Sequence, residues 1–154
     1  MIVERIEPIS DQKIGDIIYP RTAEMNERKK HVEQIFEEIR NKMFPHLPSR
    51  LNSVYVYPKS EHDYKSLWLY YKYSHRIANY NLIEAEAEYV YWFDASYYNQ
   101  ILPTTPDTLI HEYAVKYWSS HMKEEKFTYN MDIEGLCSHV IIKSCKQEHY
   151  PVKI

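Results

Sequence analysis

The sequence predicts an α+β fold, in which helices pack on a compact mixed sheet, as a single domain over residues 1–154. Three observations support this. The hydrophobic spacing switches between a two-residue and a helical period from segment to segment. The two-residue segments are short and rich in β-branched and aromatic residues. The chain is 44% hydrophobic and 27% charged, which is the range of globular domains. The resulting order of strands alternating with helices is typical of α+β proteins.

Three extended segments lie in the first 57 residues of the chain. Ile2–Glu7 shows partial alternation of apolar and polar residues and is followed by Pro8, which ends a strand. Gly15–Pro20 is a second short extended piece. Ser53–Tyr57 is rich in β-branched and aromatic residues and is expected to be a core strand.

The strongest periodic signal predicts a helix over Ala23–Met43. Val32, Phe36 and Ile39 fall on one stripe, and polar side chains lie elsewhere, so the helix should pack on the sheet through these three residues. Thr22 is the expected N-cap, and Pro45 the expected stop.

The rest of the chain continues the alternation. We expect a helix over Glu61 to about His75, one or two strands in residues 79–94, a short helix in 95–102, a helix in 106–120 capped by Thr105, and a closing strand in 135–145. The strand residues Leu82–Glu86 and His139–Lys143 should join Ile2–Glu7 and Ser53–Tyr57 in one sheet.

Composition excludes several classes of function. The net charge of −3, without a block of like charge, argues against general nucleic-acid binding. No run approaches the roughly 18 consecutive apolar residues of a membrane span, and the N-terminal residues contain no apolar signal core. We therefore expect a cytoplasmic protein without membrane contact. With only two glycines, the chain has no Gly-rich phosphate loop.

The two cysteines predict a reduced protein without a bound metal. Cys137 and Cys145 are too few for a disulfide scaffold. In a single strand they would share a face with His139, which permits a metal site, but no close pair of ligands anchors one. His111 begins a sequence similar to H-E-x-x-H, in which Val115 replaces the second histidine.

The segment "FPHLPSRLNSVYVYP", residues 44–58, places a proline-fixed cationic turn before a core strand. Two interpretations are open. The turn serves only to stop the helix, and Arg50 pairs with a surface carboxylate. Alternatively, Arg50 and Ser53 face a ligand. We expect the second, in which replacing Arg50 weakens ligand binding and leaves the fold intact, because a surface ion pair contributes little.

The stretch "EQIFEEIRNKMFPHLPSRLNSVYVYP", followed by "SLWLYYK", "YNLIEAEAE" and "EGLCSHVII", resembles a small bacterial and phage domain family with an ADP-ribosyltransferase-like fold. The resemblance implies that NAD is the substrate. It implies contacts to NAD from Arg5 and Arg50, stacking of Tyr55 or Tyr57 on the nicotinamide, and catalytic roles for Ser53 and Glu134.

The implied chemistry suits these residue types. Cleavage of the nicotinamide–ribose bond develops positive charge on the ribose, which a carboxylate stabilises. Glu134 is the expected acid, in a loop before the last strand, and its replacement by glutamine should reduce NAD turnover about 10²–10³-fold. Asp132, Glu84 and Glu86 are the alternatives. A guanidinium fits a diphosphate in bidentate fashion.

The sequence thus leads to two functional hypotheses. In the first, the protein transfers ADP-ribose from NAD to a protein or nucleic-acid acceptor, or hydrolyses NAD. In the second, it is a small phage or bacterial interaction protein, without enzymatic activity, that inhibits a protein partner through its tyrosine-rich surface. An enzyme requires Arg5, Arg50, Ser53 and Glu134 to converge in one cleft, whereas an inhibitor requires an exposed apolar patch.

Overall fold

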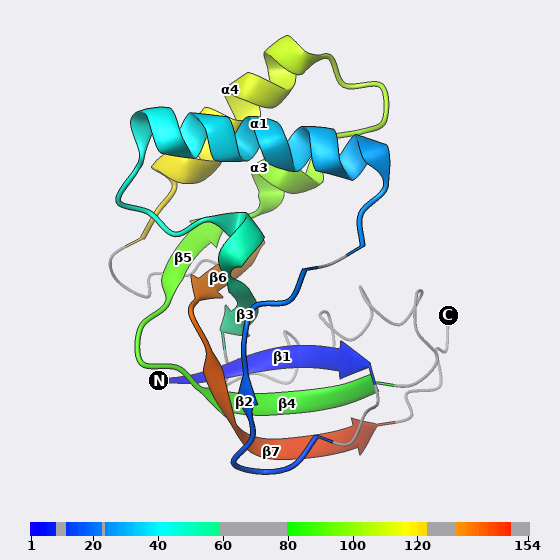
Figure 1. The fold of residues 1–154 in the computed structure, drawn as a ribbon, viewed down its shortest axis with the longest axis vertical. Coiled ribbons are helices and arrows are strands. Elements are labelled where there is room, and N and C mark those ends of the chain that lie inside the picture. The colour runs from blue at the N-terminus through cyan, green and yellow to red at the C-terminus, as the bar shows by residue number, and fades with distance from the viewer. Residues whose placement is uncertain (9–11, 23, 59–79, 123–131, 149–154) are drawn as a thin grey trace.

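The computed structural model describes residues 1–8, 12–22, 24–58, 80–122 and 132–148 (Figure 1). The helices gather at one end of the molecule, strands β1, β4 and β7 lie at the other end, and β3, β5 and β6 lie between them. The helix expected over Glu61 to His75 lies outside the described residues. No helix in the described ranges is long and apolar enough to span a membrane.

The described strands form one seven-stranded sheet in the order β2-β7-β4-β1-β3-β6-β5. The strands are β1 Ile2–Pro8, β2 Ile17–Ile18, β3 Val54–Pro58, β4 Tyr80–Glu86, β5 Tyr91–Asp94, β6 Ile133–Cys137 and β7 Val140–Glu148. The prediction that the four expected segments share one sheet is confirmed. The prediction of a mixed sheet, with both parallel and antiparallel pairs, is wrong. Every described pairing is antiparallel.

The antiparallel arrangement follows from where the chain reverses. It reverses between β1 and β2, so β2 runs opposite to β1, and the helix α1 (Glu27–Met43) then returns the chain to β3 in the same direction as β2. Strands joined through a helix are usually parallel. Here β2 and β3 are parallel, but three strands separate them, so no parallel pair of neighbours results.

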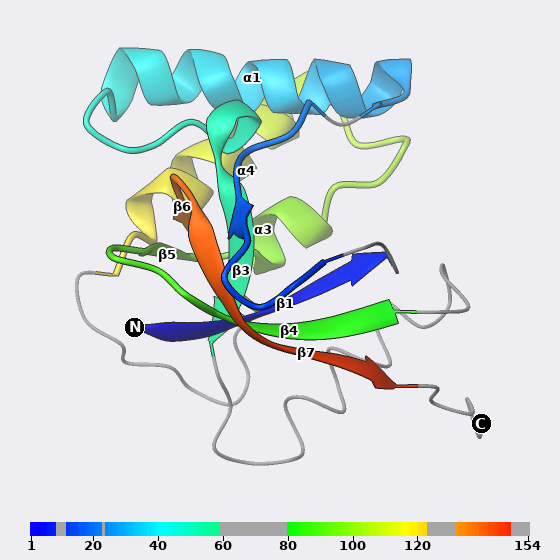
Figure 2. The same ribbon diagram turned by 60° about the horizontal axis from the view of Figure 1, so that its bottom comes forward.

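The sheet consists of two halves that are joined by a short ladder. Among the described residues, β1 and β3 pair at Val3 with Pro58 and at Glu4 with Tyr57, whereas β1 and β4 pair over seven residues. The expected single closing strand is two strands, β6 and β7, separated by Ser138 and His139. β6 pairs in one half and β7 in the other, so the chain crosses between the halves at this point (Figure 2).

The two halves enclose one hydrophobic core, and we call the sheet surface that lines it the inner face. The buried residues of this core come from both halves: Val3, Ile83, Ala85 and Ile142 from one, and Val54, Val56, Trp92, Ile133 and Cys137 from the other. We call the opposite surface of the sheet the outer face, and over β3, β5 and β6 this face packs on the helices. Tyr55, Phe93 and Leu136 pack there against α1 and α4 (Asp107–Ser119).

The helix α1 confirms the predicted packing and corrects its start. Phe36 is fully buried, Val32 is buried, and Ile39 is partly buried against the same core. The N-cap is Asn26 rather than Thr22, because the Asn26 side chain accepts a hydrogen bond from the Lys29 backbone.

Of the other two α-helices that the structure describes, one is shorter than expected and the other begins one residue later than expected. α3 covers Ser96–Asn99, and α4 begins at Asp107. The expected cap Thr105 lies outside α4 and accepts instead from the backbone of Leu102, while Pro106 occupies the N-cap position.

Gly135 is required where β6 passes the inner core. A Cβ atom at this position would lie 2.7 Å from the Trp92 ring and closer still to the Val90 side chain. Both neighbours are buried, so neither has room to move. We expect Gly135→Ala to lower the free energy of unfolding by about 1–3 kcal/mol, the usual cost of overpacking. Urea denaturation tests this, and a Gly135→Ala protein as stable as wild type would contradict it.

Candidate functional site

Polar side chains form two clusters on opposite surfaces of the sheet. The first is centred on Arg50, which begins the 3-10 turn η1 (Arg50–Asn52) between α1 and β3. The Ser49 side chain caps this turn by accepting from the Leu51 backbone. The turn points the Arg50 side chain into the core between α1, α4 and β6, where only 4% of it is exposed.

The Arg50 guanidinium binds two carboxylates from different elements. Its Nε and Nη2 donate to Glu33 of α1 at 3.1–3.2 Å. Its Nη1 donates to the Tyr117 hydroxyl at 2.8 Å and to Glu134 of β6. Tyr117 in turn donates to Glu134 at 2.6 Å. The charged group therefore links α1, α4 and β6 in a buried hydrogen-bond network.

Aromatic rings enclose this guanidinium. The ring centroids of Tyr98, Tyr117 and Tyr55 lie 4.1, 4.9 and 5.1 Å from the Arg50 Cζ atom. Such distances allow cation–π attraction, which strengthens when water is excluded. Burial raises the pKa of all three phenols. The phenols therefore remain neutral hydrogen-bond donors.

The charge on Arg50 is stabilised by its surroundings. Burial by itself lowers the pKa of a guanidinium, but the Tyr117 and Tyr55 phenols and the Glu134 and Glu33 carboxylates outweigh it and raise the pKa of Arg50 well above its ordinary value. Arg50 is therefore a permanent buried cation, and its partners are fixed by charge as well as by hydrogen bonds.

This geometry corrects two expectations. Arg50 does not face solvent or pair with a surface carboxylate, because Glu33 and Glu134 hold it in the core. Glu134 is not a loop carboxylate at a cleft. It lies within β6, on the helix-facing surface, with 10% of its side chain exposed. Their expected roles toward NAD stay predictions, and in this arrangement both side chains hold elements of the fold together.

The second cluster contains Arg5, Glu7 and Arg21 on the inner face. Arg5 Nε donates to Glu7 at 2.5 Å, and Arg21 Nη1 donates to the other oxygen of Glu7 at 3.3 Å. Glu7 is 2% exposed, whereas Arg5 is 20% and Arg21 60% exposed at their side chains. The cluster thus runs from a buried carboxylate to an exposed guanidinium.

Arg5 occupies the place where the two halves of the sheet separate. The ladder between β1 and β3 ends at Glu4 and Tyr57. The next carbonyl of β3 facing this side, that of Tyr55, accepts from Arg5 Nη1 at 2.6 Å. Arg5 is therefore held in position by Glu7 and by the Tyr55 carbonyl.

The predicted site residues divide between these two clusters. Tyr55 joins the Arg50 cluster, and its hydroxyl donates to the Arg50 carbonyl at 2.9 Å. Ser53 lies beside it and donates to the Ser49 carbonyl at 2.6 Å. Tyr57 is opposite Glu4 in the ladder, so the two share the outer face of the sheet. Arg5 lies on the inner face, and the expected convergence with Arg50 and Glu134 is not observed.

The alternative acids also lie away from Arg5. Glu84 is opposite Glu4 on the outer face, and Glu86 pairs with Lys143 at 3.0 Å on the surface. Asp132 accepts from the Asn99 side chain at 3.0 Å beside α3. Among the described residues, the carboxylate that Arg5 contacts is that of Glu7, which was not one of the acids predicted from the sequence.

Sequence reasoning also missed Arg21 and Glu33. Glu33 carried a readable signal, because it lies directly beside Val32 and three residues before Phe36, on the border of the buried stripe. A carboxylate at such a position requires a buried partner. Arg21 carried no comparable signal, since nothing local predicts its contact with Glu7.

The cysteines lie on separate strands and are free. Cys137 of β6 is buried, and burial raises the pKa of its thiol to about 11. Cys145 is partly buried on β7. Cys137, His139 and Cys145 were expected to share one face of a single strand. They do not, because the strand is interrupted at Ser138 and His139. In the part of the chain that the structure describes, no group of histidine, cysteine and acidic residues is arranged to hold a metal.

Comparison with known proteins places the chain in a family. No curated protein matches the chain. One family model, described as "Protein of unknown function (DUF2441)", matches residues 11–144. The matched region begins before β2, includes the Arg50 cluster and Arg21, and ends within β7. Because the match covers most of the 154 residues, this protein is a member of the DUF2441 family.

Proposed function

We propose that this protein is an ADP-ribosyltransferase-like protein that binds NAD on the inner face and transfers ADP-ribose to a protein or nucleic-acid acceptor, or to water. The observation that carries the proposal is the position of Arg5. It projects from the first strand to the point where the sheet halves separate, and Glu7 and the Tyr55 carbonyl fix its guanidinium.

The guanidinium of Arg5 suits an anionic ligand. A guanidinium binds a phosphate oxygen through charge-assisted hydrogen bonds, each contributing about 1.5–3 kcal/mol. Partial burial reduces screening by water, so the interaction is stronger than at an exposed arginine. A glycine-poor chain has no phosphate loop, and a side chain fixed by backbone and carboxylate contacts supplies the same recognition.

The Arg50 cluster has a separate role in this proposal. Its turn begins β3, whose Tyr55 carbonyl holds Arg5. Fixing Arg50 to α1 and β6 therefore fixes the strand that positions Arg5. The rigid cationic turn before the core strand acts on the ligand site through β3 rather than by direct contact.

The experiment is a pair of measurements on purified protein. Nicotinamide release from NAD, with and without cell lysate as a source of acceptor, tests the activity, and calorimetry tests NAD binding. We expect Arg5→Ala to weaken NAD binding by about 1.5–3 kcal/mol, with Arg5→Lys recovering only part of this. Wild-type protein that neither binds NAD nor releases nicotinamide would contradict the proposal.

The second candidate function, an interaction protein without enzymatic activity, is favoured by a different surface. Ile14, Ile17 and Tyr19 are 72%, 46% and 61% exposed around β2, the terminal strand of the sheet. A terminal strand with exposed apolar side chains suits pairing with an extended segment of another protein. Absence of NAD binding together with a specific protein complex lost on Ile17→Lys would favour this candidate.

A further inference from the structure

We propose that Arg21 is a second phosphate-binding residue, which acts with Arg5 as a clamp selective for a diphosphate, and that Glu7 positions both. The inference rests on the proposed function for the identity of the ligand. Arg21 lies outside the sequence motif that resembles the ADP-ribosyltransferase-like family. The ligand that the two arginines would recognise is a nucleoside diphosphate such as ADP-ribose.

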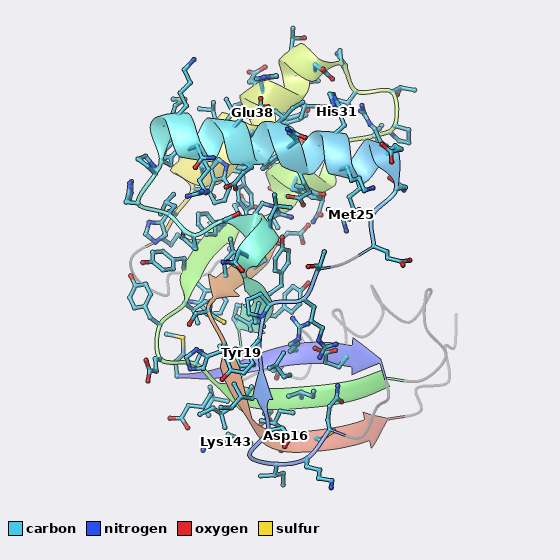
Figure 3. The ribbon with its side chains drawn as sticks, in the orientation of Figure 1. Asp16, Tyr19, Met25, His31, Glu38 and Lys143 are labelled. Atoms are coloured by element: carbon cyan, nitrogen blue, oxygen red, sulfur yellow. The ribbon has the colours of Figure 1, made fainter. Side chains whose placement is uncertain are left out.

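The two arginines reach the same carboxylate from different parts of the chain. Arg5 is on β1, and Arg21 lies on the connection that leads from Tyr19 at the sheet to Met25 below α1 (Figure 3). Each donates to a different oxygen of Glu7, at 2.5 and 3.3 Å. One buried carboxylate therefore sets the separation of two guanidinium groups.

The balance of charge favours an anion at this place. Two guanidinium groups share one carboxylate, which leaves one positive charge in excess within the cluster. Glu4 on β1 and Glu84 on β4 lie opposite each other in the ladder, and their carboxylates are on the outer face. The positive excess therefore lies on the inner face, where the enclosed core lowers the local dielectric.

The two arginines differ in a way that suits a clamp. Arg5 is fixed by Glu7 and by the Tyr55 carbonyl, and 20% of its side chain is exposed. Among the described residues, Arg21 donates to Glu7 through one longer bond, and 60% of its side chain is exposed. Arg5 provides a preorganised donor for one phosphate group, and Arg21 closes over the second with little structural cost.

This geometry predicts selectivity between ligands with one and two phosphates. A monophosphate occupies the fixed Arg5 donor and gains little from Arg21. A diphosphate gains a second charge-assisted contact, which the planar donor fork of an arginine makes better than the ammonium of a lysine. The selectivity for ADP-ribose over AMP should therefore depend on Arg21.

The test measures binding of ADP-ribose and AMP by calorimetry to wild type, Arg21→Ala, Arg21→Lys and Lys116→Ala. Lys116 is the matched control, because it is an exposed cation paired with Glu112 on α4. We expect Arg21→Ala to weaken ADP-ribose binding about 10-fold to 100-fold and AMP binding less than about 3-fold. Arg21→Lys should recover part of the loss, and Lys116→Ala should change neither affinity.

Binding and turnover separate this inference from the proposed function. Equal loss of affinity for both ligands in Arg21→Ala, unchanged affinity for both, or absence of ADP-ribose binding in wild type would each overturn the clamp. Selective loss of ADP-ribose affinity supports it even if wild type releases no nicotinamide from NAD, an outcome that would overturn the catalytic part of the proposed function alone. Because the side chain is largely exposed, Arg21→Ala should fold as wild type.

Discussion

Replacing Arg50 with methionine should lower the free energy of unfolding by about 3–5 kcal/mol, the usual cost of removing one partner from a buried ion pair. The variant leaves Glu33 and Glu134 in the core without their cation. It also removes the contact between the guanidinium and the Tyr117 hydroxyl. This replaces the expectation that an Arg50 variant keeps its stability, which assumed a surface side chain. Urea denaturation followed by circular dichroism measures the loss.

A matched control and a rescue make this prediction specific. Lys143→Met removes a cation that pairs with Glu86 but is 48% exposed, and it should change stability by no more than about 0.5 kcal/mol. Adding Glu33→Gln to Arg50→Met removes a stranded charge and should recover part of the lost stability. An Arg50→Met protein with the stability of wild type would show that the guanidinium does not hold these elements together.

Alkaline pH should destabilise the protein, with a slope that approaches about 4 kcal/mol per pH unit well above pH 10. Burial raises the pKa of Tyr55, Tyr98 and Tyr117 in the folded chain. In the unfolded chain these phenols ionise near pH 10. Above that pH the unfolded state binds fewer protons than the folded state, so the free energy of unfolding falls by about 1.4 kcal/mol per pH unit for each phenol.

The same reasoning gives the lower end of the pH window. Below about pH 9 the phenols are protonated in both states, so their stabilising contribution is complete there and is lost as pH rises. Cys137 adds to the loss, because its thiol ionises near pH 9 when unfolded and only at about 11 when folded. Urea denaturation at pH 8, 9, 10, 11 and 11.5 measures the slope.

One substitution tests whether the buried phenols cause this slope. Tyr117→Phe should reduce the slope above pH 10 by about one proton, or 1.4 kcal/mol per pH unit. Tyr89→Phe is the control, since Tyr89 is 57% exposed, and it should leave the slope unchanged. A slope that is equal in wild type and Tyr117→Phe would contradict the assignment.

Local patterns predicted most elements because period and composition are local properties. The stripe through Val32 and Phe36 is buried as expected, and the segments around Val54 and Ile83 are strands of one sheet. The strand break at Ser138 and His139 was not predictable, because β-branched residues follow without a proline or glycine to mark it. That break depends on which distant strands β6 and β7 pair with.

The candidate site was predictable only in part. The proline-fixed turn indicated Arg50, and the family resemblance indicated Arg5 and Glu134. In the structure Arg50 donates a hydrogen bond to Glu134. Which surface of the sheet each side chain occupies depends on register, and a shift of one residue exchanges the two surfaces. The contact of Arg21 with Glu7 joins residues from separate segments, which no local pattern records.

The pairing of the strands also bears on how the chain folds as it is synthesised. β2 pairs with β7, so Ile17 meets Ile141, and β1 pairs with β4, so Val3 meets Ala85. Contacts so distant in sequence raise the contact order, which slows folding. The partners of the first two strands, β4 and β7, are synthesised much later than β1 and β2 themselves. The crossing from β6 to β7, which joins the two halves, is synthesised near the end of translation. An emerging chain therefore exposes unpaired strand edges for most of its translation, which is the period when a nascent chain most needs a chaperone.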